Sequence, residues 1–342
     1  MNSDLPQAVP FIPAPKQIEL IAPLGKALRH TGKILFEPFD MGKWFIIGFC
    51  AWLATLGKGG GPSFGYNFDS SSFRHGSQEA RQFIDSLPWF IPLIIAVSIL
   101  GLLVALLFLW ISSRGKFMFL YCAVNNCAFV KYPWSQFRRQ GNSVFLFRLV
   151  IWFFGMICAG LCVVLGFGLF AALRAGFPRD GAILLAILGA SMIGVPLLMI
   201  IYTILDVTED FVIPIMVRQG RLCIPAWKVC WRLIRDHFGK FVLYWLFKLL
   251  LTVVIGAMVF AFAVGTCCVG LIVMSIPYLG AVVLLPITCF WRSFSAFYLR
   301  QFGDEFDIFP PEPPAAPTPA PFVTPAAVEP GNRGIDGPAT TA

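Results

Sequence analysis

Charge and histidine are both scarce in this sequence. Charged residues make up 13% of the 342 positions, and the three histidines, at positions 30, 75 and 237, stand far apart. So few ionisable side chains exclude a hydrated surface around the whole chain. No P-loop, HExxH motif or spaced cysteine and histidine quartet is present to hold a metal or a phosphate. The sequence therefore predicts a protein that is not an enzyme and that needs neither metal nor cofactor.

A disulfide framework is also absent. The ten cysteines lie mostly inside apolar runs or in loops that we expect to face the cytoplasm, where thiols stay reduced. Cys158 and Cys162 are one helical turn apart, as two metal ligands would be, but no histidine or further cysteine pair completes a site. Packing of small residues between helices is the favoured interpretation.

Apolar residues dominate the chain. Hydrophobic side chains account for 58% of it, and phenylalanine alone occurs 35 times, which is more than one soluble core could bury. The predicted fold class is an all-α integral membrane protein. The net charge is +8, but lysine and arginine are scattered between apolar runs, a pattern that indicates membrane topology and no nucleic-acid partner.

Six apolar segments predict a six-helix transmembrane domain at residues 44–303. A bilayer core about 30 Å thick takes roughly 20 helical residues. The 43 residues from Leu249 to Trp291 carry no charge, so that run is expected to cross twice. The first segment, with 14 residues, is the shortest. The expected spans are residues 44–57, 89–111, 144–173, 182–205, 241–265 and 271–297.

Both ends of the chain are predicted to be flexible tails. Residues 1–16 contain four prolines and no periodic apolar pattern, and residues 304–342 are rich in proline and alanine. Between the first tail and the first span, residues 17–43 show the basic amphipathic pattern of a helix at the membrane surface.

Basic residues divide unevenly between the two sides of this topology. Nineteen of the 26 lysines and arginines precede the first span, lie in the loops after the second and fourth spans or follow the core of the last span, and five fall in the other loops. Two more, Arg148 and Lys248, lie close to the basic side, where their long side chains can reach the interface. Basic loops stay in the cytoplasm. Both termini are therefore predicted to be cytoplasmic.

A second basic amphipathic helix is predicted after the fourth span, from Ile224 to His237. Tryptophans on one side and arginines on the other are typical of a helix among lipid headgroups. Pro225 suits its first turn and Gly239 its C-terminal cap. Residues 113–141 repeat the pattern in outline, which makes two or three cytoplasmic surface helices. The residues expected to contact the membrane surface are Trp227, Lys228, Trp231, Arg232 and Arg235.

The chain contains a faint internal similarity. Aligning Trp134 with Trp231 also pairs Arg138 with Arg235, at an offset of 97 residues. In both copies a span, a helix with tryptophan and arginine, and a returning span follow in order, as in a parallel repeat. Duplication and chance similarity both remain open.

Small residues one turn apart indicate faces where membrane helices approach closely. The fourth and fifth predicted spans each carry such a stripe, and we expect the two stripes to meet in the bundle interior. Bulky substitution at either stripe is expected to destabilise the fold. The packing residues are Ala182, Ala186, Ala190 and Gly194 on the fourth span and Ala257, Ala261 and Gly265 on the fifth.

Acidic residues gather at the end of the fourth predicted span. Asp206, Glu209 and Asp210 share one helix face. Carboxylates at a helix C-terminus oppose the macrodipole, so they need a partner, and Arg292 at a similar depth is the expected one. An ion pair that joins the fourth span to the sixth is the favoured interpretation, and binding of a cation or a headgroup amine is the alternative.

Four stretches carry a resemblance to a known family: RGKFMFLYCAVNNCAFVKYPW, GNSVFLFRL, DFVIPIMVRQG and LLPITCFWRSFSAFYLRQFG. Together they look like a family of uncharacterised bacterial multi-pass membrane proteins, which implies the bacterial inner membrane. The arrangement is more distantly similar to the membrane domain attached to some glycerophosphodiester phosphodiesterases. The resemblance covers roughly residues 36–307. The hydrolase domain is missing, so no phosphodiesterase activity is implied.

Two classes of function are predicted. The first is a non-enzymatic membrane scaffold whose basic surface helices bind anionic lipid, a membrane-protein partner or a second copy of the chain. The second is a small-solute or lipid transporter that uses the fourth and sixth spans, kinked at Pro196 and Pro286. The near absence of ionisable residues at the midplane argues against ion coupling. An intramembrane enzyme comes third.

Overall fold

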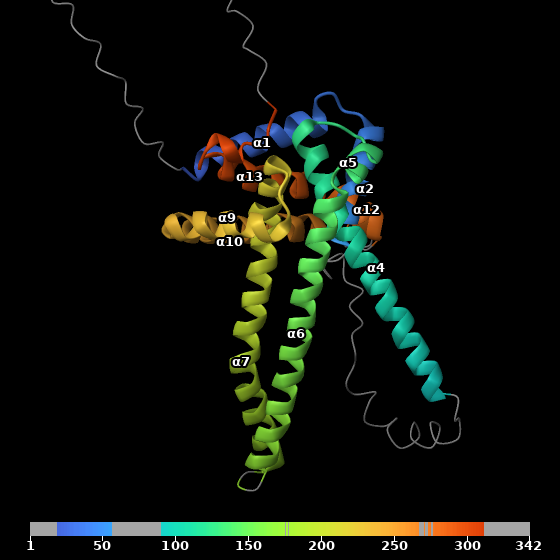
Figure 1. Cartoon of the computed structure of the whole chain (residues 1–342), viewed down its shortest axis with the longest axis vertical. Coiled ribbons are helices and arrows are strands. Elements are labelled where there is room, and N and C mark those ends of the chain that lie inside the picture. Colours follow the sequence, from blue (N-terminus) through green and yellow to red (C-terminus); the bar gives the residue numbers. More distant parts are fainter. Residues whose placement is uncertain are drawn as a thin grey trace, which may run out of the picture. The chain divides into compact units, whose positions relative to one another are not determined.

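The computed structural model describes residues 19–56, 90–174, 176, 178–266, 270, 273–274 and 276–310. These residues form helices joined by short connections, with no strand among them (Figure 1). The predicted tail at residues 1–16, the loop at 57–89 and most of the second tail lie outside the described residues. The helices of the first half are α1 (Ile21–Phe36), α2 (Met41–Thr55), α4 (Phe90–Asn125), α5 (Lys131–Gln136) and α6 (Arg138–Leu173).

The helices of the second half follow one another with few interruptions. They include a π-helix, η1, and a short 3-10 helix, η2. Their bounds are α7 (Arg179–Val207), η1 (Thr208–Val212), α8 (Ile213–Gln219), α9 (Cys223–Asp236), α10 (Phe238–Gly265), α12 (Pro277–Val283), α13 (Leu285–Arg300) and η2 (Asp304–Phe306).

Four helical stretches are long and apolar enough to cross a membrane. They are Pro92–Asn125, Arg138–Leu173, Gly181–Gln219 and Phe238–Gly265. Their large apolar side chains are mostly exposed, and Met192, for example, is 77% exposed. Apolar surface on this scale is stable where lipid covers it. α2 is apolar but has only 15 residues, so a count of six crossings stays a prediction.

The fourth predicted span does not end where the sequence suggested. α7 continues through η1 into α8, and the run stops at Gly220, whose φ of +65° is the left-handed conformation that glycine adopts most easily. Asp206, Glu209 and Asp210 therefore lie inside a continuous helical run. The expectation that they oppose a helix C-terminus was wrong, because the terminating glycine comes ten residues after Asp210.

The segment predicted as the sixth span is interrupted. α12 ends at Val283 and α13 begins at Leu285. Pro286 is the second residue of α13 and has no N–H to continue the hydrogen bonds of the preceding helix. Most of α13 is buried within the protein. This part of the predicted span is therefore a core helix rather than a lipid-facing one.

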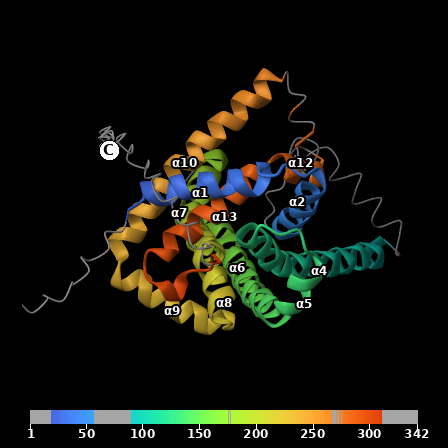
Figure 2. The ribbon, with the colours of Figure 1, turned by 90° about the horizontal axis from the view of Figure 1, so that it is seen from above.

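A packed core lies at one end of the long helices. It unites parts of α1, α4, η1, α9, α10 and α13. The ring centroids of Tyr244 and Tyr298 are 4.6 Å apart, and those of Phe211 and Tyr244 are 5.1 Å apart. Close aromatic pairs of this kind add to the stabilisation from buried area. Figure 2 shows α1 crossing α13, and a second apolar cluster joins α1, α2, α4 and α13.

The helix α9 is anchored to this core by a face of small and apolar residues. Its buried positions are Cys223, Ala226, Cys230 and Ile234. The sequence predicted that the tryptophans share the apolar face, but Trp231 is 62% exposed. The buried face is therefore rotated about the helix axis relative to the predicted one. The expected cap, Gly239, is inside α10, since α9 already ends at Asp236. In Figure 1, α9 lies across the direction of α6 and α7.

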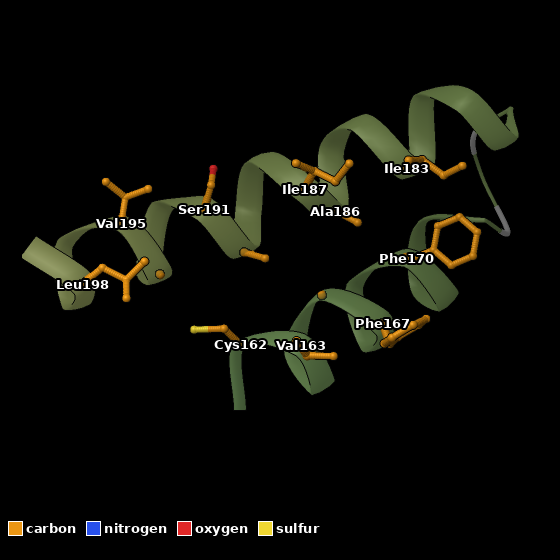
Figure 3. A pocket seen from close by; sticks show the side chains of 13 residues that line it. Cys162, Val163, Phe167, Phe170, Ile183, Ala186, Ile187, Ser191, Val195 and Leu198 are labelled. Carbon is orange, nitrogen blue, oxygen red and sulfur yellow. The ribbon is translucent and has the colours of Figure 1, made fainter. Parts of the chain in front are cut away.

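α6 and α7 pack side by side as a hairpin. A Cβ on Gly166 of α6 would lie 3.5 Å from the Cβ of Ala190, and one on Gly194 would lie 3.8 Å from the sulfur of Cys162. Figure 3 shows the groove of about 680 Å³ between the two helices, lined by apolar and small side chains. The short connection after Leu173 makes these two helices neighbours.

The predicted contact between the fourth and fifth small-residue stripes is not formed. The stripe with Ala186, Ala190 and Gly194 faces α6, while Ala257 and Ala261 on α10 are exposed. Figures 1 and 2 both show α10 running across the α6–α7 hairpin rather than along it. The small residues were correctly expected to lie at a helix contact on α7, but the partner helix was wrong.

Candidate functional site

The acidic cluster lies on the last turn of α7 and on η1. Glu209 and Asp210 are 5% and 8% exposed, and carboxylates this deeply buried need cationic partners. One-turn π-helical insertions widen a helix locally and occur often at functional sites. The widened turn here directs two acidic side chains toward different neighbouring helices.

Glu209 joins three elements of the core. Its Oε1 accepts a hydrogen bond from the Lys116 ammonium on α4. On α13, Arg292 donates from Nη2 to Oε2 at 3.0 Å and from Nη1 to the Glu209 carbonyl oxygen at 2.6 Å. The structure thus brings Arg292 to Glu209, and it adds Lys116, which the sequence analysis had assigned to a basic loop.

Asp206 and Asp210 pair with a different cation. Lys248 on α10 donates to both oxygens of Asp206, at 2.8 and 2.7 Å, and also to Oδ2 of Asp210. The hydroxyl of Tyr244 donates to the same Oδ2 at 3.1 Å. A single lysine therefore ties α10 to the end of α7 and to η1.

The two basic residues expected to reach outward are turned into the protein instead. Arg148 is 6% exposed, and its Nη1 donates to the hydroxyls of Ser112 and Ser113 on α4, each at 3.3 Å. The side chain of Lys248 is 19% exposed. The expected extension to the interface was wrong for both, because hydroxyl and carboxylate acceptors lie within reach on the preceding long helix.

These two cations occupy matching places in the two halves of the chain. Arg148 is the eleventh residue of α6, and Lys248 is the eleventh residue of α10. Arg148 donates to Ser112 on α4, and Lys248 donates to Asp206 on the run from α7 to α8. Each acceptor lies thirteen residues before its helical run ends, at Asn125 and Gln219 respectively. In both halves a short helix, α5 or α9, comes between the two long ones. Arg148 and Lys248 are 100 positions apart and Ser112 and Asp206 are 94 apart, so this correspondence does not follow the offset of 97 residues, and duplication and chance similarity both remain open.

A polar pocket of about 270 Å³ opens beside this network. Its charged lining residues come from α7, η1, α10 and α13. Tyr202 on α7 and Thr252 on α10 are exposed residues of its wall, on stretches whose neighbours are apolar and exposed. The lining residues are Ala51, Ala54, Thr55, Phe119, Tyr202, Asp206, Glu209, Asp210, Lys248, Thr252, Thr288, Trp291 and Arg292.

The predicted membrane-contact residues of α9 divide into two groups. Trp227 is half-buried, packs on Phe147 with ring centroids 5.9 Å apart, and donates from Nε1 to the Thr208 hydroxyl at 3.2 Å. It therefore packs against the core and is only partly exposed. The exposed members are Lys228, Trp231, Arg232 and Arg235.

A second, apolar groove runs along α9. It has a volume of about 380 Å³ and lies between α7, α9 and the start of α10. Trp227, Trp231 and Trp245 line it together with Arg235. Aromatic rings next to an arginine combine an apolar surface with a donor for anionic groups.

The described cysteines belong to no metal-binding group. All eight are free thiols, and no group of three or more His, Cys, Asp or Glu side chains in the described ranges could hold a metal ion. Burial raises the pKa of Cys223 and of Cys230 to about 12. These two thiols therefore stay protonated at neutral pH, where they are poor nucleophiles.

The prediction that the protein is not an enzyme rested in part on the absence of a GxSxG elbow, and that absence was wrong. Residues 61–65 spell Gly-Pro-Ser-Phe-Gly, the spacing of the nucleophile elbow in α/β-hydrolases. That elbow joins a strand to a helix and requires acidic and histidine partners. The segment lies outside the described residues, so the structure does not test it.

The described residues define an all-helical protein with four helices long enough to cross a membrane and a buried ion-pair network between them. The chain belongs to a family of unknown function, DUF7544, whose model matches residues 19–290. The comparisons found no match among curated proteins or solved structures. The likeness to the membrane domain of phosphodiesterases and the bacterial origin stay predictions.

Proposed function

We propose that this protein is a non-enzymatic membrane protein that binds lipid at the membrane surface through α9. The division of this helix supports the proposal. Four buried positions attach α9 to the core, which leaves Trp231, Arg232 and Arg235 exposed on its other sides. The basic side chains are thus presented from an ordered helix rather than from a flexible loop, which lowers the entropic cost of binding.

The chemistry beside α9 suits a lipid with an anionic headgroup. Arg235 lines the apolar groove with three tryptophans, so one lipid would place its phosphate at the arginine and its acyl chain along the rings. Each lysine or arginine near an anionic membrane surface contributes about 1 kcal/mol to attraction. The predicted cytoplasmic location of α9 is the side on which anionic lipids attract basic segments.

Replacing Arg232 and Arg235 together with glutamine tests this function. We expect retention of anionic lipid by the purified protein to fall roughly thirty-fold, because about 2 kcal/mol of attraction is lost. The measurement is the amount of phosphatidylglycerol that remains bound after exchange in detergent. Unchanged retention would remove the support for α9 as the lipid-binding element.

A matched control separates a specific site from total charge. Arg218→Gln with Arg221→Gln removes two positive charges from exposed residues outside α9. This variant should retain anionic lipid almost as well as the unaltered protein. Equal losses in both double variants would show that net charge, and not α9, determines binding.

Lipid or solute transport is the second candidate, and the polar pocket favours it. Transporter sites commonly lie where helices are interrupted, and this pocket adjoins the π-helix η1 and is lined by Arg292. Substrate-dependent flux in proteoliposomes that disappears in Pro196→Ala or Arg292→Gln would rank transport first. Flux equal to that of empty liposomes would leave surface binding as the function.

A further inference from the structure

We propose that the polar pocket beside η1 binds the headgroup of a zwitterionic phospholipid that carries a primary amine. This site is distinct from the exposed side of α9. It would select lipids by the dipolar chemistry of the headgroup rather than by net negative charge. Four observations support it: the charges of the lining residues, their remaining hydrogen-bonding capacity, the volume of the pocket and the apolar surface beside it.

The pocket presents both signs of charge to one small space. Asp206, Glu209 and Asp210 line it together with Lys248 and Arg292. A ligand with one charge would meet like charges as well as opposite ones. A headgroup with an ammonium at one end and a phosphate at the other can satisfy both kinds of side chain at once.

The lining side chains have capacity beyond the contacts already described. Both hydrogen bonds to the Asp210 carboxylate end on Oδ2, and a carboxylate can accept at either oxygen. Arg292 donates once from Nη1 and once from Nη2, whereas a guanidinium has five N–H donors. A ligand ammonium can therefore approach Asp210, and a ligand phosphate can approach Arg292, without breaking the ion pair to Glu209.

The volume fits a headgroup and not a whole lipid. At about 270 Å³ the pocket is smaller than the roughly 300–1,000 Å³ of sites that enclose drug-sized ligands. The rest of a larger ligand must then lie outside the pocket, along the neighbouring surface.

That neighbouring surface is apolar. Tyr202, which lines the pocket, is 68% exposed on α7, and Met199, one turn away on the same helix, is 64% exposed. On α10, Leu249 is 61% exposed, next to the lining residue Lys248. Acyl chains leaving the pocket would cover these side chains, so a lipid suits the site better than a soluble zwitterion.

The acidic residues favour a primary amine over a choline group. A primary ammonium donates three N–H bonds, and charge-assisted hydrogen bonds to carboxylates are among the stronger ones in proteins. A trimethylammonium has no donor. Stepwise N-methylation of the headgroup therefore removes the proposed interaction one donor at a time while the phosphate and the acyl chains stay the same.

The first test uses the full chain in detergent and native mass spectrometry. The probes are phosphatidylethanolamine, its N-monomethyl and N,N-dimethyl forms, phosphatidylcholine and phosphatidylglycerol, all with identical acyl chains. We expect retention to fall at each methylation step, roughly ten-fold in all from phosphatidylethanolamine to phosphatidylcholine. Equal retention across the series would overturn the proposal, and so would stronger retention of phosphatidylglycerol at this site.

The second test blocks the pocket without altering its ion pairs. Thr252→Trp places a large ring at the exposed wall, and Val253→Trp places the same ring on the next residue, which is 63% exposed and does not line the pocket. The Thr252 variant should lose the phosphatidylethanolamine preference and the Val253 variant should keep it. The same preference in both variants would overturn the site. If Thr252→Trp does not fold, the methylation series on the unaltered protein still decides.

Two further experiments distinguish a lipid from a soluble headgroup compound, and the polar pocket from α9. Soluble glycerophosphoethanolamine should compete at least ten-fold less well than the lipid, because it lacks acyl chains, and equal competition would overturn the assignment to a lipid. The Arg232→Gln and Arg235→Gln double variant should keep its phosphatidylethanolamine preference. Loss of that preference would show that the phosphatidylethanolamine site lies on α9. Reduced retention of anionic lipid with an unchanged preference would bear only on the function proposed for α9.

Discussion

At the scale of single residues, the buried charges contact one another instead of water. Lys116 is 1% exposed and is paired with Glu209, which also forms an ion pair with Arg292. Removing one member of such a network leaves the others buried without compensation, which is far more destabilising than the pairing is stabilising. Glu209 is therefore the residue on which the junction of α4, η1 and α13 depends most.

Glu209→Gln should lower stability by about 3–5 kcal/mol, because it removes the carboxylate that pairs with the buried Lys116 and the partly buried Arg292. Thermal unfolding of the purified protein in detergent measures the effect. Asp236→Asn is the matched control, since Asp236 forms a surface pair with Arg235 at 3.8 Å and its side chain is 51% exposed. Such pairs contribute about 0–1 kcal/mol. Similar unfolding temperatures for the two variants would contradict a structural role for Glu209.

His30 on α1 gives a second prediction, about pH. Its Nε2 donates to the Ala123 carbonyl oxygen at 3.0 Å, and the rings of Phe297 and Phe309 lie edge-on to it at 5.6 and 5.0 Å. Burial lowers the pKa of His30 below its ordinary value of 6.5. The folded protein thus favours the neutral ring, and the stability from this site is present above that ordinary value and declines as the pH falls below it.

The unfolding temperature of the unaltered protein should therefore drop between pH 7 and pH 5 by more than that of His30→Gln. The glutamine can donate to the same carbonyl but does not titrate. The difference between the two pH profiles isolates His30 from the other titrating groups. Parallel profiles would show that protonation of His30 has no effect on folding.

At the scale of helices, the contact of α2 with α4 depends on one glycine. A Cβ on Gly115 would lie 2.8 Å from the Ala54 nitrogen and 2.8 Å from the Leu53 carbonyl carbon, both of which are backbone atoms. Backbone atoms cannot move away by a change of rotamer, as a flexible side chain can. The close approach of these two helices therefore requires the missing side chain at position 115.

Gly115→Ala should destabilise the protein by about 1–3 kcal/mol, because the two helices must separate to admit the methyl group. On the same helix, Gly101 has nothing within 4 Å of the position a Cβ would take. Gly101→Ala should be neutral or stabilising by up to about 1 kcal/mol, since alanine is the better helix former. Unfolding in detergent measures the stability of both variants. Equal stabilities would contradict a close contact of α2 with α4 at Gly115.

The long helices could be predicted from hydropathy, and their ends could not. The apolar runs at α6 and α10 are within a few residues of the predicted spans. α7 runs on into α8, because the polar residues Asp206 to Asp210 find partners and Gly220 comes later. The last predicted span divides at Pro286, a residue that the sequence analysis treated as a kink within one helix.

At the scale of the whole molecule, two distant parts of the chain are joined directly. The backbone N–H of Glu19 donates to Oε1 of Gln301 at 2.8 Å, and Nε2 of Gln301 donates to the Glu19 carbonyl oxygen at 2.9 Å. α1 also packs on α13. This contact supports the prediction that an even number of crossings places both termini on one side of the membrane.

Reporter domains fused before Met1 and after Ala342 should therefore report the same compartment. The positive-inside rule predicts that this compartment is the cytoplasm. A phosphatase and fluorescent-protein pair, each active on one side only, provides the measurement in cells. Reporters found on opposite sides would require an odd number of crossings and would contradict the contact between Glu19 and Gln301.

The sequence by itself determined the class of the protein, the positions of its long apolar helices and the clustering of its acidic residues. These properties follow from composition and from periodicity over neighbouring residues, which are local. Only the tertiary structure decided which cations meet the acids, which side of α9 is buried and which helix receives the small residues of α7. Those outcomes depend on helices far apart in the sequence: Lys116 and Glu209 are separated by 93 positions, and no local pattern records that they will meet.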